Sequence, residues 1–374
     1  MKVLVAPLDW GLGHATRCVP VIREFLNQGA EVELAVVRAN AGLLRGIFPE
    51  LRQRLAPSYN IVYPKHGYNM GLWLVKNGAH LRSVMNYEHR FAEEMVERYH
   101  YDVLVSDNRF GFYSRNAKSI YMTHQCRIAF PRVLSAFEPL GMLWHASVMK
   151  HFEEVWVPDL PKFPGYAGAM SHVRKCSVPM KYVGALSRFS ETSAAPLENG
   201  LESSLGTYRF VAIVSGVEPA RTRFENLLRK TLTKIPGRHA IILGKPSAGV
   251  ERSTEGNLDL FTHLPDAAFA KVVRSAQWVV SRGGYSTVMD MAVLGAKCVF
   301  VPTPGQYEQV ILARDLAREG YAVSIDESNF SIETLLANIG ERENVALPKP
   351  GDNDLLKDAV SSLIARNPQF STDG

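Results

Sequence analysis

Residues 281–290 read Ser-Arg-Gly-Gly-Tyr-Ser-Thr-Val-Met-Asp, and this stretch decides the fold class. The apolar run 278–280 before it predicts a buried strand, and residues 288–294, followed by Gly295, predict a helix. A glycine pair at such a junction lets backbone N–H groups approach an anion, and the helix N-terminus adds partial positive charge. The pattern therefore predicts a binding site for a nucleotide diphosphate.

Two side chains extend this predicted site. Arg282 would add a bidentate contact to a phosphate. Asp290, one turn into the helix, would accept hydrogen bonds from two ribose hydroxyls. A local alternative stays open, because Thr287 and Asp290 also have the spacing of a capping box and the glycine pair could be a turn alone.

Composition limits the class of protein. The chain has 374 residues, 46% of them apolar, which predicts two or three domains with substantial cores. A net charge of +5 is too weak to indicate nucleic-acid binding. No apolar run approaches the ~18 residues of a membrane span, and the first strand leaves no room for a signal peptide. The four cysteines are Cys18, Cys126, Cys176 and Cys298. They lie far apart and lack the spacing of metal ligands, so we expect a cytoplasmic protein without zinc or disulfides.

The same unit opens both halves of the chain. The first half begins with a predicted strand at 2–7, a glycine loop at 8–14, a helix at 15–28 and a strand at 32–37. The second half repeats this order, with a strand at 210–214, a glycine loop at 215–219, a helix at 221–232 and a strand at 240–243. This repeat predicts an α/β fold of two doubly wound, Rossmann-like domains facing across a cleft, with ligands at the carboxyl ends of the strands.

The domain boundaries follow from composition. We expect an N-terminal domain over 1–186 and a linker over 187–206, where Ser, Glu, Ala and Gly replace any periodicity. A C-terminal domain would cover 207–374 and end in a helix, 355–365, which we expect to pack back on the N-terminal domain.

Polar residues follow two predicted strands of the N-terminal half, 101–109 and 119–125. Because carboxyl ends of parallel strands share one edge of a sheet, these residues should lie beside the 11–14 loop. The candidates for this ligand site are Gly13, Asn108, Arg109, His124 and Gln125.

Five motifs then resemble the GT-B glycosyltransferases, and most closely family 28, which includes the enzyme that adds N-acetylglucosamine to the undecaprenyl-linked peptidoglycan precursor. They are residues 11–17, 123–125, 184–188, 282–290 and 302–309. The chain departs from that enzyme at Asp290, where the family usually has Glu, at Asp9 and Trp10 in the first loop, and at Glu308. These departures indicate a relative with another acceptor.

The resemblance implies that 1–186 is an acceptor-side domain, which makes the five candidates at its strand ends acceptor-side residues, and that 207–374 is a nucleotide-sugar-binding domain. It also implies roles for particular residues. His14 corresponds to the histidine near the reacting hydroxyl, and Asp290 to the position that holds the ribose. The other donor-side positions that it implies are Arg188, Ser215, Gly216, His263, Leu264, Arg282 and Gln309. The loops around them add Arg221, Gly283, Gly284, Ser286, Thr287 and Glu308 as donor-side candidates.

The implied reaction is an inverting transfer of a sugar from UDP-GlcNAc or another UDP-hexose to an acceptor hydroxyl. His14 is the expected general base, with Asp9 as the group that orients it or as the rival base. No cofactor or metal is expected, since helix N-termini and arginines would stabilise the diphosphate. The one Asp-x-Asp, at 352–354, is interpreted as the start of the last helix. A non-hydrolysing UDP-sugar epimerase and a nucleotide-sugar-binding subunit remain alternatives.

Residues 70–90 combine an apolar segment, 70–76, with nearby basic residues. They are compatible with peripheral contact to the inner face of a membrane or with a lipid-linked acceptor. The alternative is a buried helix with solvated basic residues. The expected partners are thus a nucleotide-sugar donor and an acceptor that is lipid-linked or a glycan.

Overall fold

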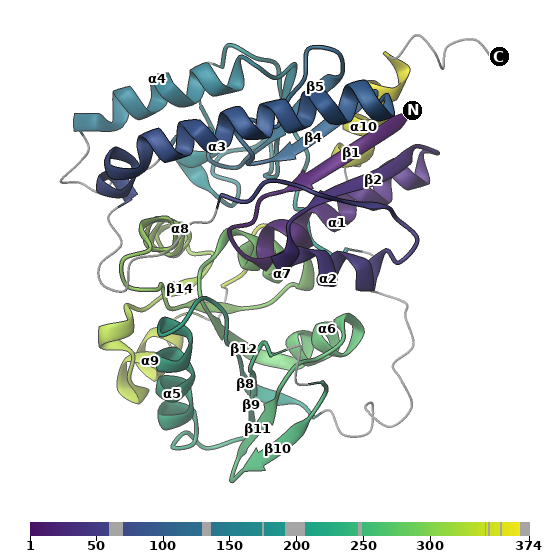
Figure 1. Ribbon diagram of the computed structural model, residues 1–374. Coiled ribbons are helices and arrows are strands. Elements are labelled where there is room, and N and C mark those ends of the chain that lie inside the picture. The colour runs from purple at the N-terminus through teal and green to yellow at the C-terminus, as the bar shows by residue number, and fades with distance from the viewer. Residues whose placement is uncertain are drawn as a thin grey trace. The chain divides into compact units, whose positions relative to one another are not determined.

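The chain forms two compact units in a computed structural model (Figure 1). Unit 1 comprises Met1–Pro64, Tyr68–Ser187 and Pro350–Gly374, and unit 2 comprises Lys65–Gly67 and Arg188–Lys349. The structure describes residues 1–59, 70–128, 136–173, 176–190, 206–245, 249–340, 342, 345–351 and 354–366; for 70–77 it describes the backbone alone.

Unit 1 contains a parallel sheet of seven strands in the order β3-β2-β1-β4-β5-β6-β7. The strands are β1 Lys2–Pro7, β2 Glu31–Val36, β3 Gln53–Leu55, β4 Val103–Asp107, β5 Lys118–Met122, β6 Glu154–Val157 and β7 Met180–Tyr182. The helices are α1 Leu12–Asn27, α2 Arg38–Ile47, α3 Met70–Tyr99, α4 Glu138–Met149 and α10 Leu355–Ala365, with a 3-10 turn at Gly168–Met170.

Helices cover both faces of this sheet (Figure 1). On one face, α3 packs on Leu4 and Leu104, and α4 packs on Tyr121 and Val155. On the other face, α1 packs against α2 and α10. This layering follows from strands that are buried along their whole length, since a parallel sheet needs cover on both faces.

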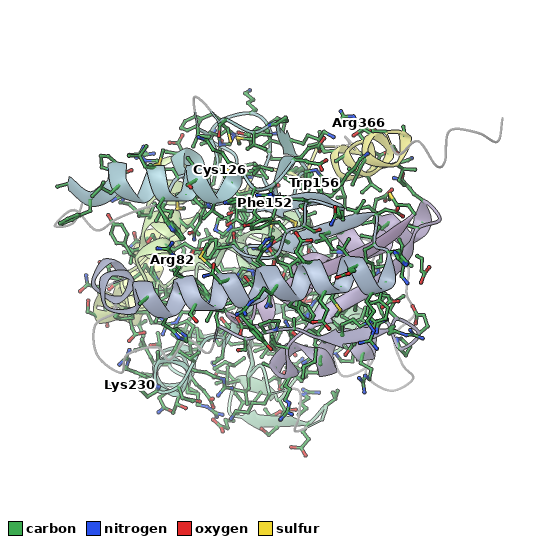
Figure 2. The ribbon with its side chains drawn as sticks, turned by 45° about the horizontal axis from the view of Figure 1, so that its top comes forward. Arg82, Cys126, Phe152, Trp156, Lys230 and Arg366 are labelled. Carbon is green, nitrogen blue, oxygen red and sulfur yellow. The ribbon has the colours of Figure 1, made fainter. Side chains whose placement is uncertain are left out.

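The last helix, α10, belongs to unit 1 rather than to the C-terminal half that precedes it. Arg366 lies just after α10 (Figure 2). It donates to Glu154 Oε1 at 2.7 Å, and Lys181 Nζ donates to Ser362 Oγ at 2.7 Å. Ser361 Oγ donates to Gln28 Oε1 at 3.0 Å. The chain therefore returns to unit 1 after Lys349.

Unit 2 contains a second seven-stranded sheet, β10-β11-β9-β8-β12-β13-β14, in which only the β10–β11 pair is antiparallel. The strands are β8 Tyr208–Ile213, β9 His239–Ile242, β10 Arg252–Glu255, β11 Leu258–Phe261, β12 Ala276–Ser281, β13 Cys298–Phe300 and β14 Val323–Ser324. The helices are α5 Ala220–Leu232, α6 Asp266–Ser275, α7 Tyr285–Leu294, α8 Tyr307–Arg318 and α9 Ile332–Gly340, with a 3-10 turn at Glu327–Asn329.

The α/β class with two Rossmann-like units is confirmed. The boundary between the units falls at Ser187/Arg188, and most of the expected linker, 191–205, lies outside the described residues. Two helices begin earlier than expected: α1 at Leu12 rather than at residue 15, and α7 at Tyr285 rather than at residue 288. In both, the residue before the helix is a glycine, Gly11 or Gly284, so the cap carries no side chain and gives little sequence signal.

No helix in the described part of the chain is long and apolar enough to cross a membrane. The side chains of 70–77, the apolar half of the expected membrane-contact segment, lie outside the description. In the rest of that segment His80, Arg82 and Arg90 are exposed, whereas His89 stacks on Tyr113 with ring centroids 4.2 Å apart.

Candidate active site

The order of strands in unit 1 decides where a ligand can bind. The order reverses between β1 and β4, and in doubly wound sheets ligands bind outside the carboxyl ends of the strands at such a point. Pro7 of β1 pairs with Asp107 of β4, so the loop after β1 and the residues after β4 leave the sheet side by side. Gly11, in the first of these loops, has φ +107°, which favours glycine.

His14 and Asp107 meet at this point. His14 lies in the first turn of α1, and its Nδ1 is 2.8 Å from Asp107 Oδ2. A carboxylate can only accept, so Nδ1 carries the proton and donates it to Asp107. In the neutral ring Nε2 then has a free lone pair, which is the arrangement of a general base.

Arg17 fixes the other side of this carboxylate. It lies one turn after His14 on α1 and is 2% exposed. Its Nε donates to Asp107 Oδ1 at 2.8 Å, Nη2 donates to the same oxygen, and Nη1 donates to His124 Nδ1 at 3.3 Å. His14, Asp107, Arg17 and His124 thus form one connected network, which we call the His14 network.

The electrostatics of the network keep His14 neutral. Burial lowers the pKa of His14, and the positive charge of Arg17 lowers it further, while Asp107 opposes both and does not outweigh them. Burial alone would raise the pKa of Asp107, but Arg17 and His14 hold it below its usual value. At neutral pH the network therefore contains a neutral imidazole and an ionised carboxylate.

Asp9 does not orient His14, contrary to the expectation from sequence. Asp9 Oδ2 accepts from Tyr59 N at 2.9 Å and from Ser58 Oγ, so its carboxylate is directed to the end of β3. The orienting carboxylate is Asp107. Sequence analysis missed it, although it is the last residue of a strand that pairs with β1.

Arg109 is a structural residue, which corrects its assignment as an acceptor-side candidate. It is fully buried, its Nε lies 2.6 Å from Glu88 Oε1, and its Nη1 donates to Pro7 O at 3.2 Å. Tyr59 completes the cluster, since its hydroxyl donates to Glu88 Oε2 at 2.5 Å. A guanidinium held in this way supports the backbone beneath the site and is not presented to a ligand.

The remaining acceptor-side candidates lie in the His14 network or at the same sheet edge. Asn108 follows β4 with φ +56° and accepts from the Tyr121 hydroxyl at 3.3 Å. His124 is 3% exposed and Gln125 is half-buried, both just after β5. The carbonyl of Gly13 accepts from Thr16 Oγ1 at 3.1 Å. Topology thus collects these four residues at one sheet edge, as expected.

In unit 2 the strand order reverses between β8 and β12. Ser215 and Gly216 follow β8, and Arg282, Gly283 and Gly284 follow β12. Since the two strands are parallel neighbours, both loops leave the same edge of the sheet. Gly216 has φ +104°, close to the value of Gly11 in unit 1. His263 and Leu264 follow β11 at this edge, and the 302–309 loop follows β13.

The N-terminus of α7 is free of a side-chain cap. Gly284 is its N-cap residue, without a side-chain hydrogen bond, and Gly295 ends the helix with φ +68°. Since the helix begins at Tyr285, Thr287 is inside the first turn, and the capping-box alternative for Thr287 and Asp290 is wrong. Ser286 and Thr287 lie in this first turn, at the helix end where the sequence predicts that an anion binds.

Arg282 is buried and occupied, which corrects its assignment as a phosphate ligand. It is 2% exposed, its Nη2 donates to Glu327 Oε2 at 2.5 Å, and Nη1 donates to the carbonyls of Val301 and Pro302 at 3.0 and 3.2 Å. Its guanidinium also lies 3.9 Å from the centre of the Phe224 ring. The residue joins α5, β13 and the 3-10 turn at Glu327.

Three other donor-side candidates also make internal contacts. Arg221 pairs with Glu218 at 3.3 Å and donates to Leu243 O, so it fixes the loop before α5. Gln309 Oε1 accepts from Thr303 N at 2.9 Å, which closes the loop before α8; Glu308 lies in the first turn of α8. Arg188 Nε lies 3.2 Å from Asp266 Oδ1. The carboxylates that pair with Arg221 and Arg188 are 57% and 38% exposed, whereas Glu327, the partner of Arg282, is 9% exposed.

The part of the chain that the structure describes contains no group of three or more His, Cys, Asp or Glu residues that could hold a metal ion. Asp352 and Asn353 of the Asp-x-Asp lie outside that part, and Asp354 is the N-cap residue of α10.

Comparison with known proteins agrees with this geometry. Residues 250–349 match the glycosyltransferase family 28 C-terminal domain. A UDP-N-acetylglucosamine–N-acetylmuramyl-(pentapeptide) pyrophosphoryl-undecaprenol N-acetylglucosamine transferase from Methylorubrum extorquens is 40% identical over 67 residues, which are 17% of this chain and 18% of that one. The similarity thus spans less than a fifth of that relative's length.

Two further similarities extend over most of the chain. An uncharacterized glycosyltransferase from Methanosarcina acetivorans is 23% identical over 340 residues, 86% of this chain and 82% of that one. The spinosyn rhamnosyltransferase SpnG complexed with thymidine diphosphate has a TM-score of 0.60 at 17% identity, covering 97% of this chain and 95% of that one. The chain therefore has the GT-B glycosyltransferase fold. The family 28 match covers residues 250–349, and the 40% sequence identity to the Methylorubrum transferase covers 67 residues.

Proposed function

We propose that this chain is an inverting glycosyltransferase that moves a sugar from UDP-GlcNAc or another UDP-hexose to an acceptor hydroxyl. The observation that carries the proposal is the His14–Asp107 pair, at 2.8 Å, at the point where the strand order of unit 1 reverses. The family 28 domain in unit 2 supports a nucleotide-sugar donor.

In this mechanism the acceptor hydroxyl transfers its proton to His14 Nε2 while its oxygen attacks the anomeric carbon. The bond from that carbon to the β-phosphate oxygen breaks, and UDP leaves with the electron pair. Asp107 stabilises the imidazolium that forms, because its carboxylate already accepts from Nδ1. Arg17 holds Asp107 ionised and in place.

Unit 2 serves the leaving group. The backbone N–H groups at the start of α7 and of the Ser215-Gly216 loop are the proposed ligands of the diphosphate, and Asp290 is the proposed ligand of the ribose. Because Arg282 is paired with Glu327, backbone N–H groups would provide most of the stabilisation of the leaving diphosphate, and Arg188 is the proposed arginine ligand beside them. No cofactor or metal ion is part of the proposed reaction.

The acceptor is proposed to be lipid-linked or a glycan, with peripheral contact to a membrane. Three large apolar side chains of unit 1 support that contact, since Phe137, Leu140 and Leu143, at or next to α4, are 55%, 63% and 68% exposed. Pelleting with anionic phospholipid vesicles tests it, with Leu140→Ser/Leu143→Ser as the variant expected to remain in the supernatant.

The decisive experiment incubates the protein with UDP-hexoses and no acceptor, and follows the nucleotide and the sugar by NMR. Slow release of UDP, with water as the acceptor, is expected. Isomerisation of the sugar without release would indicate an epimerase, and binding without either reaction would indicate a binding subunit. His14→Ala should lower the rate ~10²–10⁴-fold and leave UDP affinity unchanged. Loss of UDP affinity with an unchanged rate would make His14 a phosphate ligand instead.

A further inference from the structure

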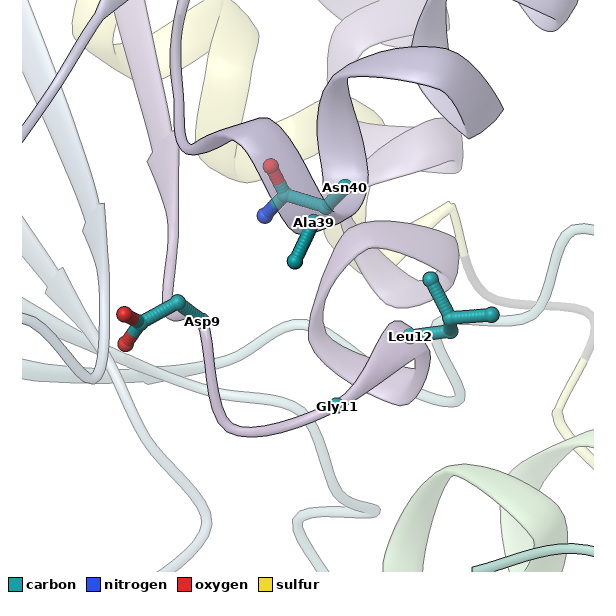
Figure 3. Close-up of a pocket in the computed structure, with 5 residues that line it drawn as sticks. All are labelled: Asp9, Gly11, Leu12, Ala39 and Asn40. Atoms are coloured by element: carbon teal, nitrogen blue, oxygen red, sulfur yellow. The ribbon is translucent and has the colours of Figure 1, made fainter. Parts of the chain in front are cut away.

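Unit 1 has a pocket of about 260 Å³ beside the His14 network, and the proposed reaction does not use it. Its lining residues are Asp9, Gly11, Leu12, Ala39 and Asn40 (Figure 3). Ala39 and Asn40, in the first turn of α2, lie opposite the loop that carries Asp9 and Gly11 (Figure 3). The pocket is therefore bounded by the starts of two helices, α1 and α2.

Asn40 brings a fixed hydrogen-bond donor to this pocket. The residue is 2% exposed, and its Oδ1 accepts from Val37 N at 3.0 Å. That bond decides the orientation of the amide, since a flipped side chain would set NH₂ against N–H. Nδ2 is buried and has no partner among the described residues.

Asp9 brings a fixed acceptor. Its Oδ2 is held by Tyr59 N and Ser58 Oγ, whereas its Oδ1 is buried and has no partner within the described ranges. A buried carboxylate oxygen without a hydrogen bond is costly and needs an explanation. Two lining residues of the pocket thus carry one acceptor and one donor atom without a partner in the described part of the chain, and both side chains are held by bonds to the backbone.

The choice of ligand follows from charge. Two helix N-termini would attract an anion, but each contributes only about half a charge. The Asp9 carboxyl oxygen is an acceptor and makes no ion pair with any described residue, so a phosphate here would place acceptor against acceptor without a cation between them. A hydroxyl can donate to Asp9 and accept from Asn40, and neighbouring hydroxyls of one molecule can do both at once.

We propose that this pocket binds a sugar ring of the acceptor through two of its hydroxyls, one donating to Asp9 Oδ1 and one accepting from Asn40 Nδ2. Assigning the ring to the acceptor rests on the proposed function, whereas binding of a polyhydroxyl ring rests on the pocket alone. Asp9 is then a specificity-determining residue rather than a base or an orienting group for His14.

The test exchanges the two side chains. Asp9→Asn keeps one oxygen that accepts from Ser58 and Tyr59, and it replaces the unpartnered oxygen, Oδ1, by an NH₂ donor. Asn40→Asp keeps the oxygen that accepts from Val37, and it replaces the unpartnered NH₂ group by an oxygen acceptor. The double variant restores one donor and one acceptor at unchanged net charge. Glu50→Gln, an exposed carboxylate outside the pocket, is the charge-matched control for Asp9→Asn.

Saturation-transfer NMR of glucose, galactose and N-acetylglucosamine, with UDP present to occupy the nucleotide site, measures binding to the full chain. At least one sugar should bind, each single variant should weaken it at least tenfold, and the double variant should return to within about threefold of the parent, because hydroxyls can reverse their roles. The control should match the parent. If one single variant fails to fold, the other single variant and the double variant still test whether sugar binding depends on this donor and acceptor.

Three results would overturn the proposal: no sugar bound by the parent, sugar binding insensitive to both single variants, or pyrophosphate binding that Asp9→Asn strengthens, which would make this an anion site. The proposed function fails separately. If sugar binding depends on Asp9 but the protein has no affinity for UDP, the sugar pocket stands and the proposed transferase function is wrong. If UDP is released but no such sugar binding is found, the proposed function stands and the sugar pocket is wrong.

Discussion

Replacing Asp107 with Asn should inactivate His14 by changing its tautomer. Arg17 only donates, through Nε and Nη2, so it must face the carbonyl oxygen of the new amide. The NH₂ group then faces His14 Nδ1, which at present donates to Asp107 across 2.8 Å. Nδ1 would have to become an acceptor, which moves the ring proton to Nε2 and leaves no lone pair there to take the proton of a hydroxyl.

The expected loss of rate is that of a missing base, ~10²–10⁴-fold, at unchanged UDP affinity. Stability also falls, because Arg17 is 2% exposed and loses its anionic partner. Breaking a buried ion pair costs about 3–5 kcal/mol, and the retained carbonyl should keep the cost at or below that range.

The assay combines UDP release with ¹⁵N NMR of the His14 ring. In the parent the Nδ1–H tautomer is expected, and in Asp107→Asn the Nε2–H tautomer. Calorimetry with UDP serves as the test of folding, and Asp358→Asn, an exposed carboxylate of α10, as the matched control. A rate within threefold of the parent, in a folded variant with the Nε2–H tautomer, would refute the role of His14 as the base.

Four further predictions address other parts of the molecule. Asp290→Asn should weaken UDP binding at least tenfold through loss of charge-assisted bonds worth ~1.5–3 kcal/mol, while 2′,3′-dideoxy-UDP loses less; equal UDP affinity would exclude the ribose contact. Arg282→Met should lower the free energy of unfolding in urea by about 3–5 kcal/mol, because Glu327 stays buried without its partner, and should change UDP affinity less than threefold; the opposite pattern would restore Arg282 as a phosphate ligand. EDTA should leave turnover within about twofold, and activity that EDTA abolishes and manganese restores would contradict a metal-independent reaction. Burial lowers the pKa of His145 to about 4 in the folded chain, whereas the unfolded chain binds this proton with a pKa of ~6.5. As the pH falls from ~6.5 to ~4, protonation therefore favours the unfolded state, and about 3 kcal/mol of the free energy of unfolding should be lost. Urea unfolding at several pH values measures this loss, which His145→Gln should reduce.

Much of the fold could be predicted because its signals are local. The buried strand β1 and the helix α10 have the predicted bounds, Lys2–Pro7 and Leu355–Ala365. Helix starts were predicted less well, since α1 and α7 follow glycines that offer no side-chain cap. The placement of α10 on unit 1 depends on contacts such as Arg366–Glu154, between residues 212 positions apart, so the sequence of the helix alone does not decide it.

The sequence by itself determined the class of fold and the edges of the two sheets at which ligands can bind, because glycine loops between strands and helices are local patterns. Only the tertiary structure decided which charged residues belong to the site. Asp107 and Arg17 form one network with His14, whereas Arg109 and Arg282, equally well placed in sequence, are buried against Glu88 and Glu327. The physical reason is that a charged side chain takes the partner that packing brings within reach, and for these pairs the partners lie 21 to 93 positions away along the chain.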